Sequence, residues 1–267
     1  MSTGLLQLQD VVLGHGARSQ AQHTSKSFSL NVSPRERLAI LGPSGAGKST
    51  LLHLMSLDLP PAMGSVTFKG RVSADWSVAE LSHHRAVMPQ NGQVAFGLEV
   101  HLVIALGRVA RAQDPCVAAI VAAAAQLACV DHLLWRRCDT LSGGELARVH
   151  LARIFAQMWD VRDSLILIDE PLAALDLGLQ VRILQSLDTF AAERHHAVVA
   201  VLHDVNHALK AFDRLVLVKE GRLFADVPSN DQAVLLFERL YGLRLESLRT
   251  ADRSLVVLPA STRCQCP

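Results

Sequence analysis

A glycine-rich segment between two ordered stretches is the first place where the sequence could do chemistry. It reads GPSGAGKST from Gly42 to Thr50, after the apolar run Leu38–Leu41 and before a stretch with helical spacing. Glycines let successive backbone N–H groups converge on an anion, and the helix that follows adds the positive end of its dipole. Lys48 can reach the β- and γ-phosphates of a nucleotide, and Ser49 can hold Mg²⁺.

This loop predicts phosphate binding but does not choose the class of enzyme, because kinases, GTPases and many ATPases share it. The chain has no Asn-Lys-x-Asp segment to read guanine, which disfavours a GTPase. We therefore expect ATP as the nucleotide, with Mg²⁺. The residues expected to contact ATP here are Gly42, Pro43, Ser44, Gly45, Ala46, Gly47, Lys48, Ser49 and Thr50.

Two carboxylates follow a second apolar run, in LILIDEP from Leu165 to Pro171. Because neighbouring strand residues point to opposite sides, Asp169 can face Mg²⁺ while Glu170 faces the γ-phosphate. Glu170 is then placed to orient and deprotonate the attacking water. Alone, an Asp-Glu pair after a strand is often a solvated loop. Beside the phosphate loop it predicts ATP hydrolysis.

A second anion site is predicted at LSGGE, Leu141 to Glu145, before another helical stretch. Ser142, Gly143 and Gly144 would offer a hydroxyl, backbone N–H groups and a helix dipole to phosphate. Alone, the segment could equally be a capped helix. Two phosphate sites on separate subdomains of one chain suggest a head-to-tail dimer, in which each ATP lies between the loop of one copy and LSGGE of the other.

Apolar runs bounded by polar or turn residues predict the strands that position these groups. They are Leu38–Leu41, Leu165–Ile168, Val198–Leu202 and Leu215–Val218. In open α/β sheets, ligands lie beyond the carboxyl ends of the strands, where the chemistry-bearing loops fall. The chain is 50% hydrophobic but only 4% aromatic, which suits a parallel sheet with Ala-rich helices.

The expected organisation is one domain over residues 1–267. Residues 1–89 and 160–225 would form the core, with a hairpin turning at Glu220-Gly221, and residues 90–159 a helical subdomain. The tail, 226–267, carries a helical stretch from Gln232 to Tyr241 and a weak strand from Ser254 to Leu258.

Composition disfavours several partners. The formal net charge is +1, so no basic excess attracts nucleic acid. The start lacks a secretion signal, and the apolar run Val117–Val130 is too short to cross a bilayer, so it predicts a packed helix. The five cysteines are odd in number and indicate a reducing cytoplasm. Cys264 and Cys266 could hold a soft metal, but a disordered tail is favoured.

The motifs in this order resemble the nucleotide-binding subunits of ABC transporters, over almost the whole chain. The resemblance implies an α/β fold: a P-loop (RecA-like) ATPase core with an N-terminal antiparallel β region and an inserted α-helical subdomain. Gln90, in RAVMPQ, resembles the Q-loop glutamine that touches Mg²⁺ and couples to the membrane partner. Asp176 resembles the D-loop residue at the dimer seam, and His203 the switch histidine that contacts the γ-phosphate.

The chain departs from this family at three places. No aromatic residue stands near Gly14 to Ala17 to stack on adenine, although His15 could substitute. Leu146 and Ala147 follow LSGGE, where two glutamines are frequent. Arg35 stands before the first core strand, where glycine is usual.

Histidines offer one alternative site. His203 and His207 are four residues apart and could share a metal on a helix, but no third ligand supports this. The pairs His83-His84 and His195-His196 are expected on solvated surfaces.

The subfamily resemblance is to ATPases that import iron siderophores, haem and vitamin B12. It rests on His203 to Arg222 and on IALGR, Ile104 to Arg108. Gln90 to Phe96, Leu151 to Trp159 and Ser254 to Pro259 resemble hemin importer ATPases, so haem is favoured over a siderophore.

The resemblance implies ATP hydrolysis coupled to transmembrane transport by a homodimer of cassettes. It would bind two integral membrane permease subunits, serve a periplasmic substrate-binding protein indirectly, and be peripheral at the cytoplasmic face of the inner membrane. Two other functions stay open. A soluble ABC ATPase of translation or DNA repair usually has two cassettes or a coiled-coil insert, and a P-loop small-molecule kinase would have no use for LSGGE.

Overall fold

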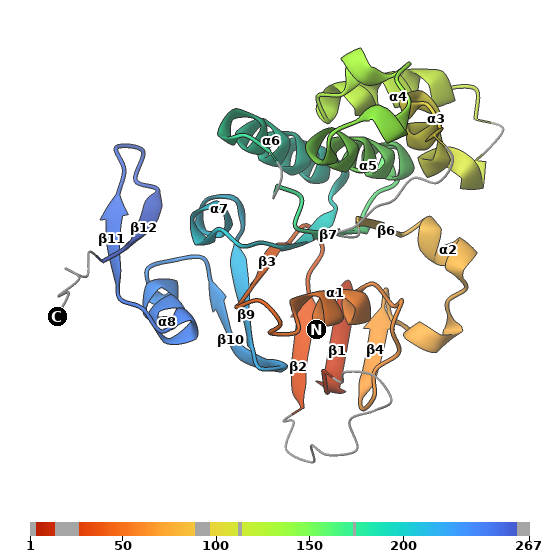
Figure 1. Ribbon diagram of the computed structural model, residues 1–267. Coiled ribbons are helices and arrows are strands. Elements are labelled where there is room, and N and C mark those ends of the chain that lie inside the picture. The colour runs from red at the N-terminus through yellow and green to blue at the C-terminus, as the bar shows by residue number, and fades with distance from the viewer. Residues whose placement is uncertain (1–3, 14–26, 89–96, 112–113, 173–174, 261–267) are drawn as a thin grey trace.

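The largest sheet of the computed structural model has six strands in the order β10-β9-β3-β8-β7-β6 (Figure 1). The structure describes residues 4–13, 27–88, 97–111, 114–172 and 175–260. The strands from β9 to β6 run parallel, and β10 pairs antiparallel with β9. The bounds are β3 Arg37–Leu41, β6 Arg85–Met88, β7 Leu165–Asp169, β8 Ala197–Val201, β9 Arg214–Lys219 and β10 Arg222–Pro228.

Both faces of this sheet are covered, which explains why its strands are continuous apolar runs. Alternate residues of β7 enter different hydrophobic clusters. Ile166 and Ile168 pack with the helical half of the molecule, whereas Leu165 and Leu167 pack with the N-terminal strands and α1. The predicted strand runs are thereby confirmed as the buried centre of an α/β fold.

A smaller antiparallel sheet covers the second face, with strand order β2-β1-β4-β5. Helix α1, Lys48–Met55, contributes Leu51 and Leu54 to the core that joins the two sheets. The bounds of the small strands are β1 Leu6–Val11, β2 Phe28–Val32, β4 Ser65–Phe68 and β5 Arg71–Val72. A short helix, α2 (Val78–Ser82), leads back into the large sheet.

Helices dominate from Val100 to Met158, at the upper right of Figure 1. The apolar run near Val117 forms α4 and packs against α3 and α5. Across the described ranges, no helix combines the length and apolarity needed to span a membrane. The bounds are α3 Val100–Ala105, the 3₁₀ helix η3 Leu106–Arg111, α4 Val117–Leu127 and α5 Gly143–Met158.

The C-terminal half places helices α6 and α7 after β7 and β8, and then adds a separate hairpin. The predicted helix Gln232–Tyr241 is present as α8. The weak strand near Ser254 is β12, Leu255–Pro259, and it pairs with β11, Leu245–Arg249, which the sequence pattern did not indicate. The remaining bounds are α6 Leu177–Arg194 and α7 Val205–Ala211.

One prediction about histidines is wrong. His196 was expected on the surface but is only 1% exposed, packed beside the ring of Phe190. Burial lowers the pKa of His196 to about 4, so the ring is neutral at physiological pH. His84 is half-buried against Trp76 rather than solvated.

The departure at Arg35 has a backbone consequence. Arg35 adopts a φ of 64°, in the left-handed region that favours glycine. The turn before β3 therefore keeps its left-handed geometry even though the residue has a side chain.

Candidate functional site

The phosphate loop connects the carboxyl end of β3 to the start of α1, as the sequence predicted. Its first glycine is required by packing, because a Cβ on Gly42 would lie 2.1 Å from the carbonyl oxygen of Val218 in β9. Gly47 precedes α1 with a φ of 101°, which side chains rarely adopt. The first turn of α1 then presents N–H groups that have no acceptor within the helix. The loop is thus shaped to bind an anion.

The Lys48 side chain lies inside the phosphate loop and donates hydrogen bonds to its backbone. This side chain is only 6% exposed, and Nζ donates to the carbonyl oxygens of Gly42 at 2.9 Å and Pro43 at 3.0 Å. Burial lowers the pKa of Lys48, while the negative charges of Glu170 and Asp169 oppose that shift. The ammonium group therefore stays inside the loop, where a phosphate would meet it.

Asp169 ends β7 as a buried carboxylate, 4% exposed. Burial raises its pKa, and a hydrogen bond with Ser49 opposes the rise. Its Oδ1 atom is buried and accepts no hydrogen bond from the described residues. An unsatisfied carboxylate oxygen beside a hydroxyl fits Mg²⁺, which proteins hold through few side chains together with substrate phosphates.

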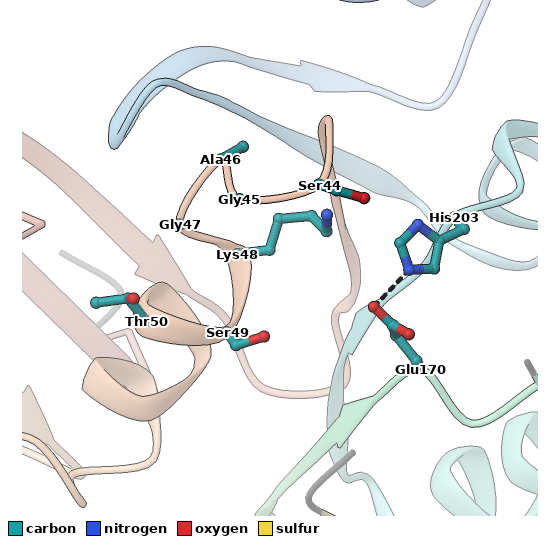
Figure 2. A pocket seen from close by; sticks show the side chains of 9 residues that line it. All are labelled: Ser44, Gly45, Ala46, Gly47, Lys48, Ser49, Thr50, Glu170 and His203. Atoms are coloured by element: carbon teal, nitrogen blue, oxygen red, sulfur yellow. Dashed lines mark hydrogen bonds and ion pairs between the residues drawn. The ribbon is translucent and has the colours of Figure 1, made fainter. Parts of the chain in front are cut away.

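Glu170 leaves the strand rather than continuing it. Its φ is 53°, and its N–H donates to the carbonyl oxygen of Val201 at 3.1 Å. The side chain is 13% exposed, and Oε1 hydrogen-bonds Nε2 of His203 (Figure 2). A turned backbone, and not the alternation of an extended strand, is what separates the two carboxylates.

His203 follows β8 and precedes α7, so it does not share a helix with His207, which lies inside α7. The two histidines therefore do not stand one turn apart on a single helix, as the proposed shared metal site would require. The His203 ring is half-exposed beside Glu170. Figure 2 shows the Lys48 side chain extending toward the side of the cavity that holds these two residues.

The cavity has a volume of about 330 Å³. It unites residues that are far apart in the chain but lie at the carboxyl ends of β3, β7 and β8. Gln90, His15, Cys264 and Cys266 fall outside the described residues. The cavity is lined by Ser44, Gly45, Ala46, Gly47, Lys48, Ser49, Thr50, Glu170 and His203.

The LSGGE segment does not line this cavity. Ser142 caps α5: its hydroxyl accepts from the Glu145 N–H at 3.3 Å, and its N–H donates to Glu145 Oε2 at 2.7 Å. Ser142 and Gly143 are exposed, and a Cβ on Gly143 would meet no atom within 4 Å. Asp176 is likewise exposed and caps α6. The segment therefore does cap a helix, as the alternative interpretation holds. Ser142 and Gly143 at the start of this helix nevertheless remain exposed on the surface.

One support of the phosphate loop had no sequence signal. The N–H of Gly221, in the turn between β9 and β10, donates to the carbonyl oxygen of Ala46 at 2.9 Å. The turn itself was predicted from Glu220-Gly221, but nothing in its residues tells which loop it would touch.

Comparisons with known proteins agree on the family. The family model for ABC transporters matches residues 25–173. The hemin import ATP-binding protein HmuV of Gloeobacter violaceus is 42% identical over 219 residues, which cover 79% of this chain and 78% of that protein. HmuV of Nocardia farcinica is 39% identical over 247 residues, covering 89% and 82%.

Solved structures show the same fold. A transporter described as an inward-facing metal-chelate type ABC transporter matches with a TM-score of 0.77 at 21% identity, covering 98% of both chains. A dimeric bacterial ABC transporter cassette matches with a TM-score of 0.74 at 24% identity, covering 84% of this chain and 99% of that one.

Burial of Asp169 predicts a trade between stability and metal binding. Because its folded-state pKa is raised, the ionised form destabilises the fold at neutral pH. Asp169→Asn should therefore raise the unfolding free energy of the nucleotide-free protein by about 1 kcal/mol, or roughly 2–4 °C in Tm. The gain should shrink as the pH falls through the raised pKa, since the parent carboxyl is then neutral as well.

Calorimetry of the nucleotide-free protein, in a buffer that contains a metal chelator, measures this change in Tm. Asp75→Asn, at an exposed carboxylate, is the matched control and should leave Tm unchanged. A lower Tm for Asp169→Asn would contradict the account.

Proposed function

Because this chain belongs to the ABC transporter family, whose cassettes bind and hydrolyse ATP, we propose that its ATPase activity drives import, with haem as the cargo. The cargo assignment is carried by one observation. Relatives named as hemin import ATP-binding proteins are 42% identical over 79% of the chain. Iron siderophores and vitamin B12 are the alternative cargoes.

The proposed catalytic site uses the cavity residues in separate roles. The triphosphate binds the loop from Gly42 to Thr50, with Lys48 against the β- and γ-phosphates. Ser49 and Asp169 would hold Mg²⁺, joined by Gln90 as the family resemblance implies. The ion would neutralise charge that develops on the phosphate oxygens.

Glu170 is the proposed general base, and His203 contacts the γ-phosphate. The support is their mutual hydrogen bond beside the phosphate loop. A carboxylate oriented by a neighbouring ring can act on the attacking water, and the ring can stabilise charge on the transferred phosphoryl group.

Glu170→Gln should keep ATP binding and lower turnover at least about 100-fold, because the amide cannot take the proton of the water. The ATP-bound dimer should accumulate, which light scattering would detect with magnesium and ATP. Glu193→Gln, at a side chain 61% exposed on α6, is the control and should hydrolyse ATP normally. Parent-like turnover in Glu170→Gln would refute its role as base.

We assign the second half of each site to another copy of the chain. Ser142 and Gly143 are exposed at a helix start outside the cavity, with Gly144 buried beside them, and Asp176 stands exposed at another helix start. In a head-to-tail homodimer, the start of α5 from one copy would meet the γ-phosphate bound by the other. The capping box engages the N–H groups of Ser142 and Glu145, and the exposed Gly143 would offer its N–H to that contact.

Two inactive variants should rescue each other if the site is shared. Ser142→Arg spoils only the donated half and Lys48→Ala only the phosphate loop. A mixed dimer of the two therefore retains one intact site. Mixing them should restore up to about a quarter of the parent ATPase rate, since half of the dimers are mixed and each has one working site.

The readout is phosphate release after the purified variants are mixed and allowed to exchange. Mixing either variant with itself is the control. If the mixture stays as inactive as its components although mixed dimers form, both halves of the site belong to one chain.

The helices between Val100 and Met158 are the proposed subdomain that meets the membrane partner. Leu102, Leu106 and Val109 recur at helical spacing and are 44%, 50% and 69% exposed. Trp135 is 76% exposed, and the centroid of its ring lies 4.5 Å from the centroid of the His101 ring. Exposed apolar residues of this kind suit protein contacts. Two permease subunits would cover them at the cytoplasmic face of the inner membrane, and the periplasmic binding protein would act through the permease.

The cargo is tested in proteoliposomes that hold the cassette with its permease and binding protein. Hemin should stimulate ATP hydrolysis, whereas a ferric siderophore and vitamin B12 should not. Stimulation by either of those instead would replace haem as the cargo. Co-purification with ribosomes or DNA and without a membrane protein would refute the transport function.

A further inference from the structure

Asn206 connects two elements that no motif or pattern in the sequence associates. Its side-chain Nδ2 donates to the carbonyl oxygen of Val257 at 3.1 Å, and its Oδ1 accepts from the Val257 N–H at 2.7 Å. Both amide groups of one side chain are thus satisfied by one residue of β12, 51 positions away. Asn206 itself lies in the first turn of α7.

The Asn206 side chain bonds to the edge of β12 in the way that the backbone of a neighbouring strand would. β12 pairs with β11 through one edge, and Val257 faces Ser247 in that ladder. In an antiparallel pair, residues whose backbone groups do not bond across the ladder point them to the opposite edge. Asn206 satisfies the N–H and C=O of Val257 at that edge. The Val257 side chain is 2% exposed, so the same residue is also anchored by packing.

The near end of this connection is the catalytic cavity. The backbone N–H of Asn206 donates to Asp204 Oδ1 at 2.7 Å, which caps α7. Asp204 follows His203 directly, and His203 hydrogen-bonds Glu170. Only Asp204 and Val205 therefore lie between Asn206, which contacts the hairpin, and His203, whose ring lies beside the proposed base.

The far end is fixed independently of α7. The N–H of Leu245, at the start of β11, donates to Glu238 Oε1 in α8 at 2.8 Å, and Arg249 pairs with Asp231 at the start of α8. Helix α8 in turn packs against β9 and β10. The hairpin is thus tied to the sheet that carries the phosphate loop, and is not a free appendage.

A second residue of this segment reaches the phosphate loop. Tyr241, the last residue of α8, is half-buried, and burial raises the pKa of its hydroxyl. A hydrogen bond with the backbone of Gly42 opposes that rise. The C-terminal elements therefore contact both the loop that begins at Gly42 and the segment that carries His203.

We propose that Asn206 is a positioning residue, through which the β11–β12 hairpin holds His203 in place for ATP hydrolysis. The proposal rests on the role proposed above for His203. It gives the C-terminal segment a part in the cycle, because displacing the hairpin would move the start of α7 and with it the histidine.

A merely structural role would have different consequences. Loss of a hydrogen-bonded clamp would then lower Tm but leave the folded enzyme with its normal kcat. A positioning role lowers kcat and leaves the affinity for ATP, which depends on the phosphate loop, nearly unchanged. It also changes the surroundings of the His203 ring.

The test compares Asn206→Ala with Asn206→Asp and Arg249→Ala in the full chain. Asn206→Ala removes both bonds to Val257, and Asn206→Asp keeps an acceptor for the Val257 N–H but loses the donor. Arg249→Ala removes only an exposed ion pair of the hairpin. It keeps the hydrogen bond between Leu245 and Glu238 that ties the hairpin to α8, and both bonds of Asn206. Steady-state ATPase assays give kcat and KM, and NMR of ¹³C-labelled histidine rings follows His203, assigned by the loss of its signal in His203→Ala.

We expect Asn206→Ala to lower kcat about three- to tenfold, in line with the loss of one or two hydrogen bonds, with KM for ATP changed less than twofold. The His203 ring signal should shift in the same variant. Asn206→Asp should lower kcat at least as far and also shift the ring signal, because its carboxylate oxygen would face the carbonyl oxygen of Val257 in place of the donor. Arg249→Ala should match the parent.

An unchanged kcat, or an unchanged ring signal alongside a reduced kcat, would overturn the proposal. If His203→Ala itself hydrolyses ATP at the parent rate, the proposed role of His203 fails. The effect of Asn206→Ala on the ring would still be measured separately. If Asn206→Ala does not fold, Asn206→Asp carries the comparison.

Discussion

The burial of Lys48 and Asp169 side by side is the constraint on which the rest of the structure depends. Each charge is almost fully removed from water, at 6% and 4% exposure, and each has a pKa shifted toward its neutral form. The free-energy cost of burying either charge would not persist in a fold selected for stability alone. The parallel sheet makes it possible, because β3 and β7 end at the same edge and bring both residues there.

This arrangement also explains how the hydrophobic core is distributed over the two faces of the sheet. The sheet must be covered on both faces to keep its strand ends fixed, so α1 and the small sheet close one face and the helical half closes the other. The start of α5 then stands outside the cavity, with Ser142 exposed. The same layering keeps the start of α5 away from the phosphate loop. The shared site that we propose therefore needs a second copy of the chain for an architectural reason as well as for its motif.

The local structure around the motifs was predictable from the sequence, and long-range contacts were not. The segment from Gly42 to Thr50 was predictable because glycine, lysine and serine have few other reasons to occur in that order between a strand and a helix. The left-handed backbone of Glu170 was not, because a carboxylate at a strand end gives no sign of its φ. His196 was misjudged for a related reason: two adjacent histidines look polar, but the first residue before a buried strand is carried into the core with it.

The contact of Asn206 with Val257 marks the limit of that approach. Each residue is ordinary in its own neighbourhood, one in the first turn of a short helix and one in a weak apolar strand, and only the tertiary structure brings them together. A side-chain amide can replace a strand because it offers one donor and one acceptor at the spacing of a peptide group. The motifs around the nucleotide are constrained by chemistry, whereas the parts that hold them are constrained only by geometry. Residues of the second kind are found only in the folded structure. Under our proposal, the one or two hydrogen bonds of Asn206 set the position of the His203 ring.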